Sequence, residues 1–149
     1  MCFAACSDIA VNAEVDPSSV DDVVHTEDVI VSQWKEFSAD ERRQMREQFD
    51  EILRPLGCET SLIVIRRANS LALYFLCMTL LALQSLRDQW SNGQLTDIVQ
   101  SLFTFLSRAT PQVRVKRLSW PLTDYERCLE FFQSLQGKQR TNRQLLTQH

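Results

Sequence analysis

The chain has 149 residues, with a hydrophobic fraction of 44% and a charged fraction of 23%, values that suit one globular domain. With only 3 Gly, it lacks the glycine-rich loops that bind nucleotide phosphates. Its formal charge of -3 is unevenly distributed, because residues 1–41 carry -9 and residues 42–149 carry +6. Positive charge is nowhere dense enough for a nucleic-acid-binding arm, so we expect no nucleic-acid partner.

The acidic N-terminal segment, residues 1–28, is expected to be loosely ordered, with a turn or linker at Asp-Pro-Ser-Ser, residues 16–19. We interpret it as a tail on a mildly basic domain; the alternative is that it folds back and shields a basic face. Beyond it, three β-branched residues at 29–31 predict a short strand. Residues 38–41 have the form of a capping box and predict the start of an amphipathic helix, which ends near residues 55–57.

The middle of the chain predicts two strands followed by two helices. Residues 61–65 and 70–77 are apolar runs separated by the short polar link Arg-Arg-Ala-Asn. The second run is apolar on both of its alternating sides, so we expect this strand to be central in the sheet and covered on both faces. Apolar residues with helical spacing then predict helices over residues 79–90 and 94–107, separated by an Asn-Gly break.

The last third of the chain predicts one more strand and a closing helix. Residues 112–116, Gln-Val-Arg-Val-Lys, alternate apolar and polar side chains, which is typical of a half-exposed strand. A capping box at residues 123–126 predicts a helix, and the polar segment 137–149 is expected to be a frayed tail. Together these elements predict an α+β domain over residues 29–136, a two-layer α/β sandwich in which helices cover a small, mostly antiparallel sheet.

The cysteines indicate a reducing compartment, and the hydropathy of the chain argues against a membrane-spanning helix. Cys77 and Cys128 lie in apolar patterns and are expected to be buried thiols, whereas Cys2 and Cys6 are assigned to the loosely ordered end, with acylation as the alternative. No secretory signal precedes them, so we expect a cytoplasmic protein. The uncharged stretch at residues 71–83 is shorter than the roughly 20 residues of a membrane-spanning helix, so we expect no transmembrane segment.

No combination of residues in the sequence is typical of an active site. The two histidines are His25, in the acidic segment, and His149, the last residue, and neither is placed to form a triad with a cysteine. Cys2, Cys6 and His25 lack the paired spacing of a zinc finger. We therefore expect no enzyme activity, no metal and no cofactor.

The best candidate for a partner-binding surface is the basic group formed by Arg114, Lys116 and Arg117 together with Trp120. Alternation places Arg114 and Lys116 on the outward side of their strand, and Trp120 follows the end of that strand. Arg and Trp are enriched at binding hot spots. The alternative interpretation is that these charges only protect an edge strand from aggregation.

Residues 29–136 resemble the N-terminal domain of the TRADD-type death-receptor adaptors. The resemblance rests on a helix before two consecutive strands, the aromatic residue before glycine in Trp-Ser-Asn-Gly at residues 90–93, and three further motifs. These are Gln-Ser-Leu at residues 100–102, the alternating strand at residues 112–116 and the closing Glu-Arg-Cys-Leu at residues 126–129. The resemblance implies an α/β sandwich that binds the trimeric domain of TRAF-type adaptors.

We therefore predict a non-enzymatic protein-interaction module, a cytosolic signalling adaptor of the death-receptor, apoptosis or innate-immune type with a TRAF-like protein partner. One alternative is a small viral or regulatory α/β protein that self-assembles through a sheet edge, which would make it a homo-oligomer. Another is a helical death-effector-type module, which would lack strands.

Overall fold

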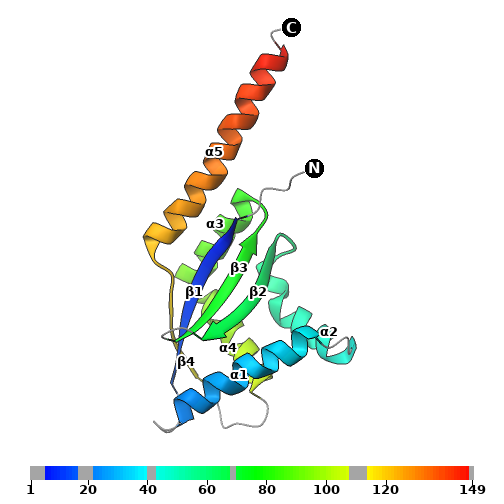
Figure 1. The fold of residues 1–149 in the computed structure, drawn as a ribbon, viewed down its shortest axis with the longest axis vertical. Coiled ribbons are helices and arrows are strands. Elements are labelled where there is room, and N and C mark those ends of the chain that lie inside the picture. Colours follow the sequence, from blue (N-terminus) through cyan, green and yellow to red (C-terminus); the bar gives the residue numbers. More distant parts are fainter. Residues whose placement is uncertain (1–5, 17–21, 40–42, 68–69, 108–113, 148–149) are drawn as a thin grey trace.

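The structure is a computed structural model that describes residues 6–16, 22–39, 43–67, 70–107 and 114–147. It shows an α+β fold in which helices pack on a four-stranded antiparallel sheet (Figure 1), and this confirms the predicted fold class. In chain order the elements are β1 (Cys6–Asp16), α1 (Asp22–Ala39), α2 (Arg43–Leu53), the short 3-10 helix η1 (Arg54–Leu56), β2 (Thr60–Arg67), β3 (Leu71–Cys77), α3 (Leu80–Ser91), α4 (Gln94–Leu106), β4 (Arg114–Ser119) and α5 (Leu122–Thr147).

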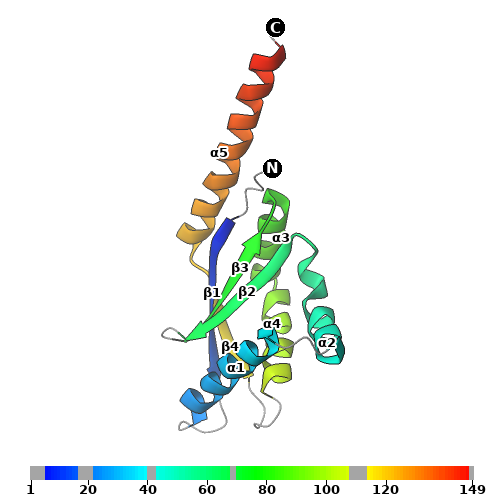
Figure 2. The same ribbon diagram turned by 45° about the vertical axis from the view of Figure 1, so that its right-hand side comes forward.

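The strands lie in the order β2-β3-β1-β4, and each neighbouring pair is antiparallel. β3 and β1 are therefore internal, while β2 and β4 form the two edges of the sheet. In both ribbon views α3 and α4 lie behind the sheet (Figures 1 and 2), so they form the second layer. α1 crosses the lower end of the strands, and α5 rises beyond their upper end.

The side of the sheet that faces α3 and α4 carries the core of the molecule. Alternate residues of the two internal strands fill it with side chains that are at most 1% exposed: Leu71, Leu73, Phe75 and Cys77 of β3 and Ile9, Val11 and Ala13 of β1. The helices contribute side chains that are also at most 1% exposed: Leu83, Leu86, Leu95, Val99, Leu102 and Phe103. Burial with a period of two is the pattern of strands that have one covered face.

The expectation of a loosely ordered N-terminal segment is wrong for residues 6–16 and 22–28. Residues 6–16 form β1, which is an internal strand, and α1 begins at Asp22. The many acidic side chains conceal the alternation of Ile9, Val11 and Ala13, which are all 0% exposed. Because these apolar side chains are removed from water, the segment is held in the sheet despite its charge.

The predicted strand at residues 29–31 is also wrong, because these residues lie within α1. Thr26, Ile30 and Trp34 follow one another at intervals of four and are 4%, 0% and 6% exposed. Residues with this spacing lie on one face of a helix, and that face packs into the core. The helical period of the whole segment therefore outweighs the short β-branched run.

The central elements follow the prediction closely. β2 and β3 correspond to the predicted strands at residues 61–65 and 70–77, and α3 and α4 correspond to the predicted helices. Thr79 caps α3, since its hydroxyl accepts a hydrogen bond from the backbone N–H of Ala82 at 3.1 Å. Gly93 has φ of 88°, a left-handed conformation that separates α3 from α4.

Two elements extend further along the chain than predicted, and parts of two other predictions lie outside the described residues. β4 continues to Ser119, and α5 runs through Gly137 to Thr147 where a frayed tail was expected, because the Lys, Gln, Arg and Leu residues that follow the glycine favour helix. Residues 40–41 of the predicted capping box and residues 112–113 of the predicted strand are outside the described residues.

The sheet also excludes one of the alternative functions that the sequence left open. A helical death-effector-type module would lack strands, so the four-stranded sheet excludes it. No helix in the described part of the chain combines the length and the apolar character that a membrane span requires.

Candidate functional site

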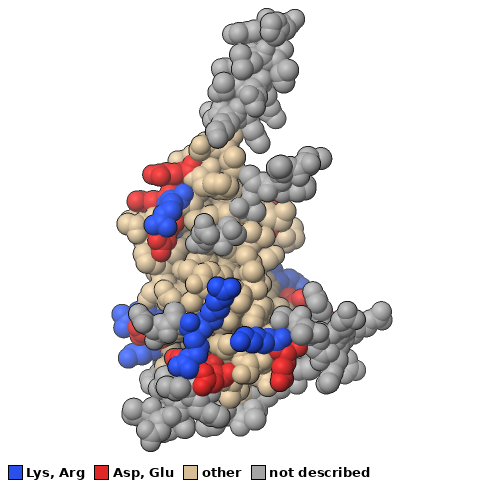
Figure 3. Space-filling model, in the orientation of Figure 1, with Lys and Arg blue, Asp and Glu red and all other residues tan. Residues whose placement is uncertain are grey.

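The sheet has a second face, on the side away from α3 and α4, which we call the outer face. Since side chains alternate along a strand, the residues between the buried ones point to this face. They are Ala10, Asn12 and Glu14 of β1, Ser61, Val64 and Arg66 of β2, Ala72, Tyr74 and Leu76 of β3, and Arg114, Arg117 and Ser119 of β4. Figure 3 views the molecule from this side and shows uncharged residues over the upper part of the strands and charged residues gathered towards the lower end.

The outer face has an apolar region built by β2 and β3. The pairing of these strands shifts between Leu62 and Val64, which makes Ile63 the extra residue of a β-bulge. Ile63 follows the inward-facing Leu62, and Val64 pairs with the outward-facing Tyr74, so both bulge residues point outward. Ile63 is 46% exposed, and Val64, Tyr74 and Leu76 are partly exposed. The expectation that β3 is covered on both faces is therefore wrong at Tyr74 and Leu76, although Ala72 on the same face is buried.

The outer face also has a basic margin along the edge strand β4. Glu14 pairs with Arg117 and Val15 with Val115, so Lys116 is the extra residue of a second bulge. As a result Arg114, Lys116 and Arg117 are all exposed on the outer face, while Val115 is only 7% exposed on the inner one. The structure thus brings the three predicted basic residues together.

The charge of Arg117 in this margin is only weakly neutralised. A guanidinium nitrogen of Arg117 lies 3.5 Å from a carboxylate oxygen of Glu14, and the two side chains are 64% and 45% exposed. An exposed pair of this kind contributes little to stability because water screens it. The edge itself is partly occupied, since the backbone N–H of Val115 donates a 2.6 Å hydrogen bond to the Gln100 side chain of α4.

Trp120 does not join this surface, because its side chain is only 2% exposed. The indole ring packs edge-on against Tyr125, with 5.5 Å between ring centres. The Arg87 guanidinium of α3 lies 4.1 Å, 5.1 Å and 5.0 Å from the ring centres of Trp90, Trp120 and Tyr125. The chain turns from β4 into α5 at this point, so the ring fills the space between α3 and α5 instead of pointing to solvent.

Sequence reasoning missed this aromatic cluster around Arg87. The signal present in the sequence is the spacing of Arg87 and Trp90, which are three residues apart and therefore neighbours on one helix face. That spacing identifies one pair, but the approach of Trp120 and Tyr125 depends on how α5 packs.

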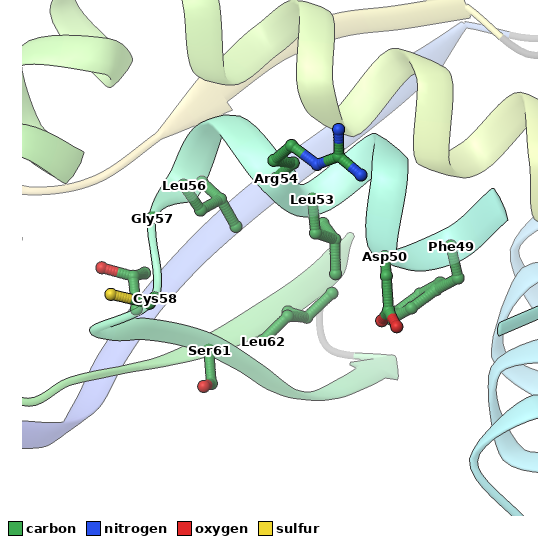
Figure 4. A pocket seen from close by; sticks show the side chains of 10 residues that line it. Phe49, Asp50, Leu53, Arg54, Leu56, Gly57, Cys58, Ser61 and Leu62 are labelled. Atoms are coloured by element: carbon green, nitrogen blue, oxygen red, sulfur yellow. The ribbon is translucent and has the colours of Figure 1, made fainter. Parts of the chain in front are cut away.

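A hollow of about 380 Å³ lies at the other edge of the sheet, between α2, η1 and the start of β2 (Figure 4). Its lining combines the apolar side chains of Phe49, Leu53, Leu56 and Leu62 with the polar residues Asp50, Arg54, Cys58, Thr60 and Ser61. In Figure 4 the Leu53 and Leu62 side chains point toward each other, and Arg54 points away from them. An apolar pocket with a few polar groups at its rim can take a small apolar group.

Three described groups have clearly shifted pKa values, and burial is the main cause in each case. Burial raises the pKa of Glu27, and the Arg67 guanidinium at 3.5 Å offsets only part of this effect. Burial also raises the pKa of Tyr125, and it raises the pKa of Cys77 to about 11. These shifts belong to packed side chains and not to acids and bases that share an open cleft, so they do not indicate general acid–base chemistry.

No group of three His, Cys, Asp or Glu side chains gathers to hold a metal ion within the described residues. Comparisons of the chain with protein-family models, with curated proteins and with solved structures found no match. The function therefore has to be inferred from the surface of the molecule.

Proposed function

We propose that the chain is a non-enzymatic protein-interaction module whose outer face binds a protein partner. The observation that supports this most is the apolar region of Ile63, Val64, Tyr74 and Leu76 on a sheet face that α3 and α4 do not cover. Apolar side chains surrounded by polar ones are the usual composition of a binding surface, in which the centre is desolvated and the rim remains wet.

The basic residues support a partner with acidic groups on its surface. Arg66 borders the apolar region, with its guanidinium 5.6 Å from the ring centre of Tyr74. Arg114, Lys116 and Arg117 add positive charge along β4. A partner that presents an apolar patch next to acidic residues complements this face, since opposite charges at the rim steer the encounter of two proteins.

The resemblance of residues 29–136 to the N-terminal domain of TRADD-type adaptors supports a more specific partner. On this basis the partner is the trimeric domain of a TRAF-type adaptor, and the chain acts in cytosolic signalling of the death-receptor, apoptosis or innate-immune type.

Self-assembly through a sheet edge is the competing function, and the β4 edge argues against it. This strand carries three exposed basic residues, contains a bulge and has one backbone N–H held by Gln100. Charged side chains and bulges are the devices by which proteins prevent edge-to-edge pairing. The outer face is therefore a better candidate surface than the β4 edge.

The test is a binding titration of the purified chain against an isolated trimeric TRAF-type domain, measured by isothermal titration calorimetry. Ile63→Asp places a charge in the middle of the apolar region without touching the core. We expect it to weaken binding at least about tenfold, the loss that is typical of a hot-spot residue. Leu81→Asp is the matched control, because Leu81 is 76% exposed on α3, in the helical layer.

Light scattering on the free chain completes the experiment. A monomer whose binding is lost in Ile63→Asp and kept in Leu81→Asp supports the proposal. Equal binding by both variants would contradict the assignment of the outer face. A concentration-dependent dimer that Ile63→Asp converts into a monomer would show instead that this face is used for self-association.

A further inference from the structure

Two buried thiols from distant parts of the chain meet at the upper end of the sheet. Cys6 is the first residue of β1 and Cys128 lies in the second turn of α5. Their sulfur atoms are 2.8 Å apart, although 122 positions separate them in the sequence. The exposed fractions of the two residues are 7% and 4%.

This distance is short for two sulfur atoms that no covalent bond joins. A disulfide bond is about 2.05 Å long, so the two sulfur atoms would move together by less than about 1 Å to form one. The side chains already point at each other across the contact between β1 and α5.

We propose that Cys6 and Cys128 are a reversible disulfide site that locks α5 onto the sheet. The proposal concerns the attachment of α5 and does not depend on the identity of a partner.

The oxidant is a peroxide, and its reaction with the two thiols is balanced. One thiolate attacks a peroxide oxygen, the O–O bond breaks and the sulfur becomes a sulfenic acid. The second thiolate attacks that sulfur, the S–S bond forms and hydroxide leaves to become water. Two thiols and one hydrogen peroxide give one disulfide and two waters. A low-molecular-weight thiol such as glutathione reverses the step by exchange.

Cys77 is the competing partner for Cys6, because the two residues lie opposite each other in the β1–β3 register. Its thiol is engaged with the Thr60 hydroxyl at 3.7 Å and is 0% exposed. Burial also raises the pKa of this thiol to about 11, which lowers its thiolate fraction. The 2.8 Å separation of the Cys6 and Cys128 sulfur atoms favours Cys128 as the residue that reacts with Cys6.

Few of the described side chains of α5 are buried, so a covalent link would strengthen the attachment of this helix to the sheet. Within the described side chains of α5, only Cys128 and Phe132 are fully buried, at 4% and 5% exposed. Leu122 and Phe131 on the same helix are 56% and 40% exposed. Tyr125, Leu129 and Leu135 of the helix are only partly buried against the core, so we expect the helix to open more readily than the core does. Such opening also admits the oxidant to both thiols. The disulfide that then forms would suppress further opening of the helix.

The test uses the full chain with Cys2→Ser and Cys58→Ser, which leaves three thiols and removes the exposed one at Cys58. The protein is treated with dilute hydrogen peroxide and digested with trypsin without reduction. Cleavage after Lys35, Arg67, Arg87 and Arg127 puts Cys6, Cys77 and Cys128 into different peptides. Mass spectrometry of the linked peptides then identifies the pair directly, in a protein whose three remaining cysteines are native.

We expect a Cys6–Cys128 peptide from monomeric protein, and a Tm that rises by about 10 °C on oxidation and returns on reduction, as expected for closing a loop of this length. Hydrogen exchange of the α5 amides should slow at the same time. Cys77→Ala in the same background should keep the oxidation-dependent shift, and Cys128→Ser should lose it.

Two results would overturn the proposal. The first is a Cys6–Cys77 peptide, or no linked peptide at all, in oxidised protein that retains its native circular dichroism. The second is a Cys6–Cys128 peptide with no change in either Tm or α5 exchange, which would mean that the link does not lock the helix.

Discussion

Arg87 and Trp120 are joined through two kinds of contact. The Arg87 guanidinium donates a 2.7 Å hydrogen bond to the backbone carbonyl of Trp120 and lies 5.1 Å from the centre of its indole ring. The neighbouring Trp90 indole N–H also donates to this segment, to the carbonyl of Leu118 at 3.1 Å. These contacts connect α3 to the end of β4 and the start of α5, where the chain turns between the two elements.

Arg87→Ala is therefore expected to destabilise the protein by about 2–4 kcal/mol, since it removes a charge-assisted hydrogen bond and a cation packed among three aromatic rings. Urea denaturation followed by tryptophan fluorescence measures the change in unfolding free energy. Arg127→Ala is the control, because Arg127 is 75% exposed and its 3.4 Å ion pair with Asp124 is screened by water, so its loss should cost less than about 1 kcal/mol. Equal losses in the two variants would show that the Arg87 cluster contributes nothing special.

Phe75→Ala should cost about 3–5 kcal/mol of unfolding free energy, because the ring is 1% exposed between β3 and the helical layer and its removal leaves a cavity. Chemical denaturation measures this loss. Ile63→Ala is the matched change on the outer face, where 46% exposure predicts a loss of less than about 1 kcal/mol. If Phe75→Ala also loses less than about 1 kcal/mol, the inner face of β3 is not the core described above.

The double charge reversal Arg114→Glu with Lys116→Glu should leave the fold and Tm unchanged, because both side chains are exposed. Partner association should slow by about tenfold or more at low ionic strength, and less in high salt, since rim charges steer encounter and salt screens them. Stopped-flow or surface plasmon resonance measures the rate constant.

Arg54→Glu with Arg127→Glu is the matched control for that experiment, since it changes the net charge equally at exposed positions in η1 and α5. If both double variants slow association alike, only net charge matters. If neither does so at low salt, Arg114 and Lys116 serve only to protect the edge strand.

Glu27 should make stability fall as pH rises. Burial raises the pKa of its carboxyl above the ordinary value of 4.5, so the folded state holds this proton more tightly than the unfolded state does. The unfolding free energy then decreases from about pH 4.5 up through the raised pKa, and the full cost applies above it. Glu27→Gln removes this component, and a series of Tm values between acidic and neutral pH should show a flatter profile for the variant.

Glu36→Gln provides the comparison for Glu27→Gln, because Glu36 is an exposed carboxyl on the same helix. The difference between the two profiles isolates the effect of burial. Identical profiles for the two variants would contradict the burial of Glu27.

The spacing of apolar residues along the sequence was sufficient to predict most helices and strands and the fold class. The apolar runs of β2 and β3, the helical stripes of α3 and α4 and the Asn-Gly break between them depend on local preferences that each segment expresses alone. The same holds for the exposure of Arg114 and Lys116, which follows from alternation along β4. Composition misled at the N-terminus, because Glu14 points to the outer face and the acidic character of the segment does not prevent burial of Ile9 and Val11.

The sequence by itself thus determined an α+β domain and the position of its basic strand, because these follow from short-range spacing. Only the tertiary structure decided that β1 is internal, that Trp120 is buried beneath Arg87, and that Ile63 and Lys116 occupy bulges on the same face. It also placed Cys6 against Cys128. Each of these depends on which strands pair, in which register, and where α5 packs. Such choices between distant segments are made by the burial of the whole core, which local patterns do not encode.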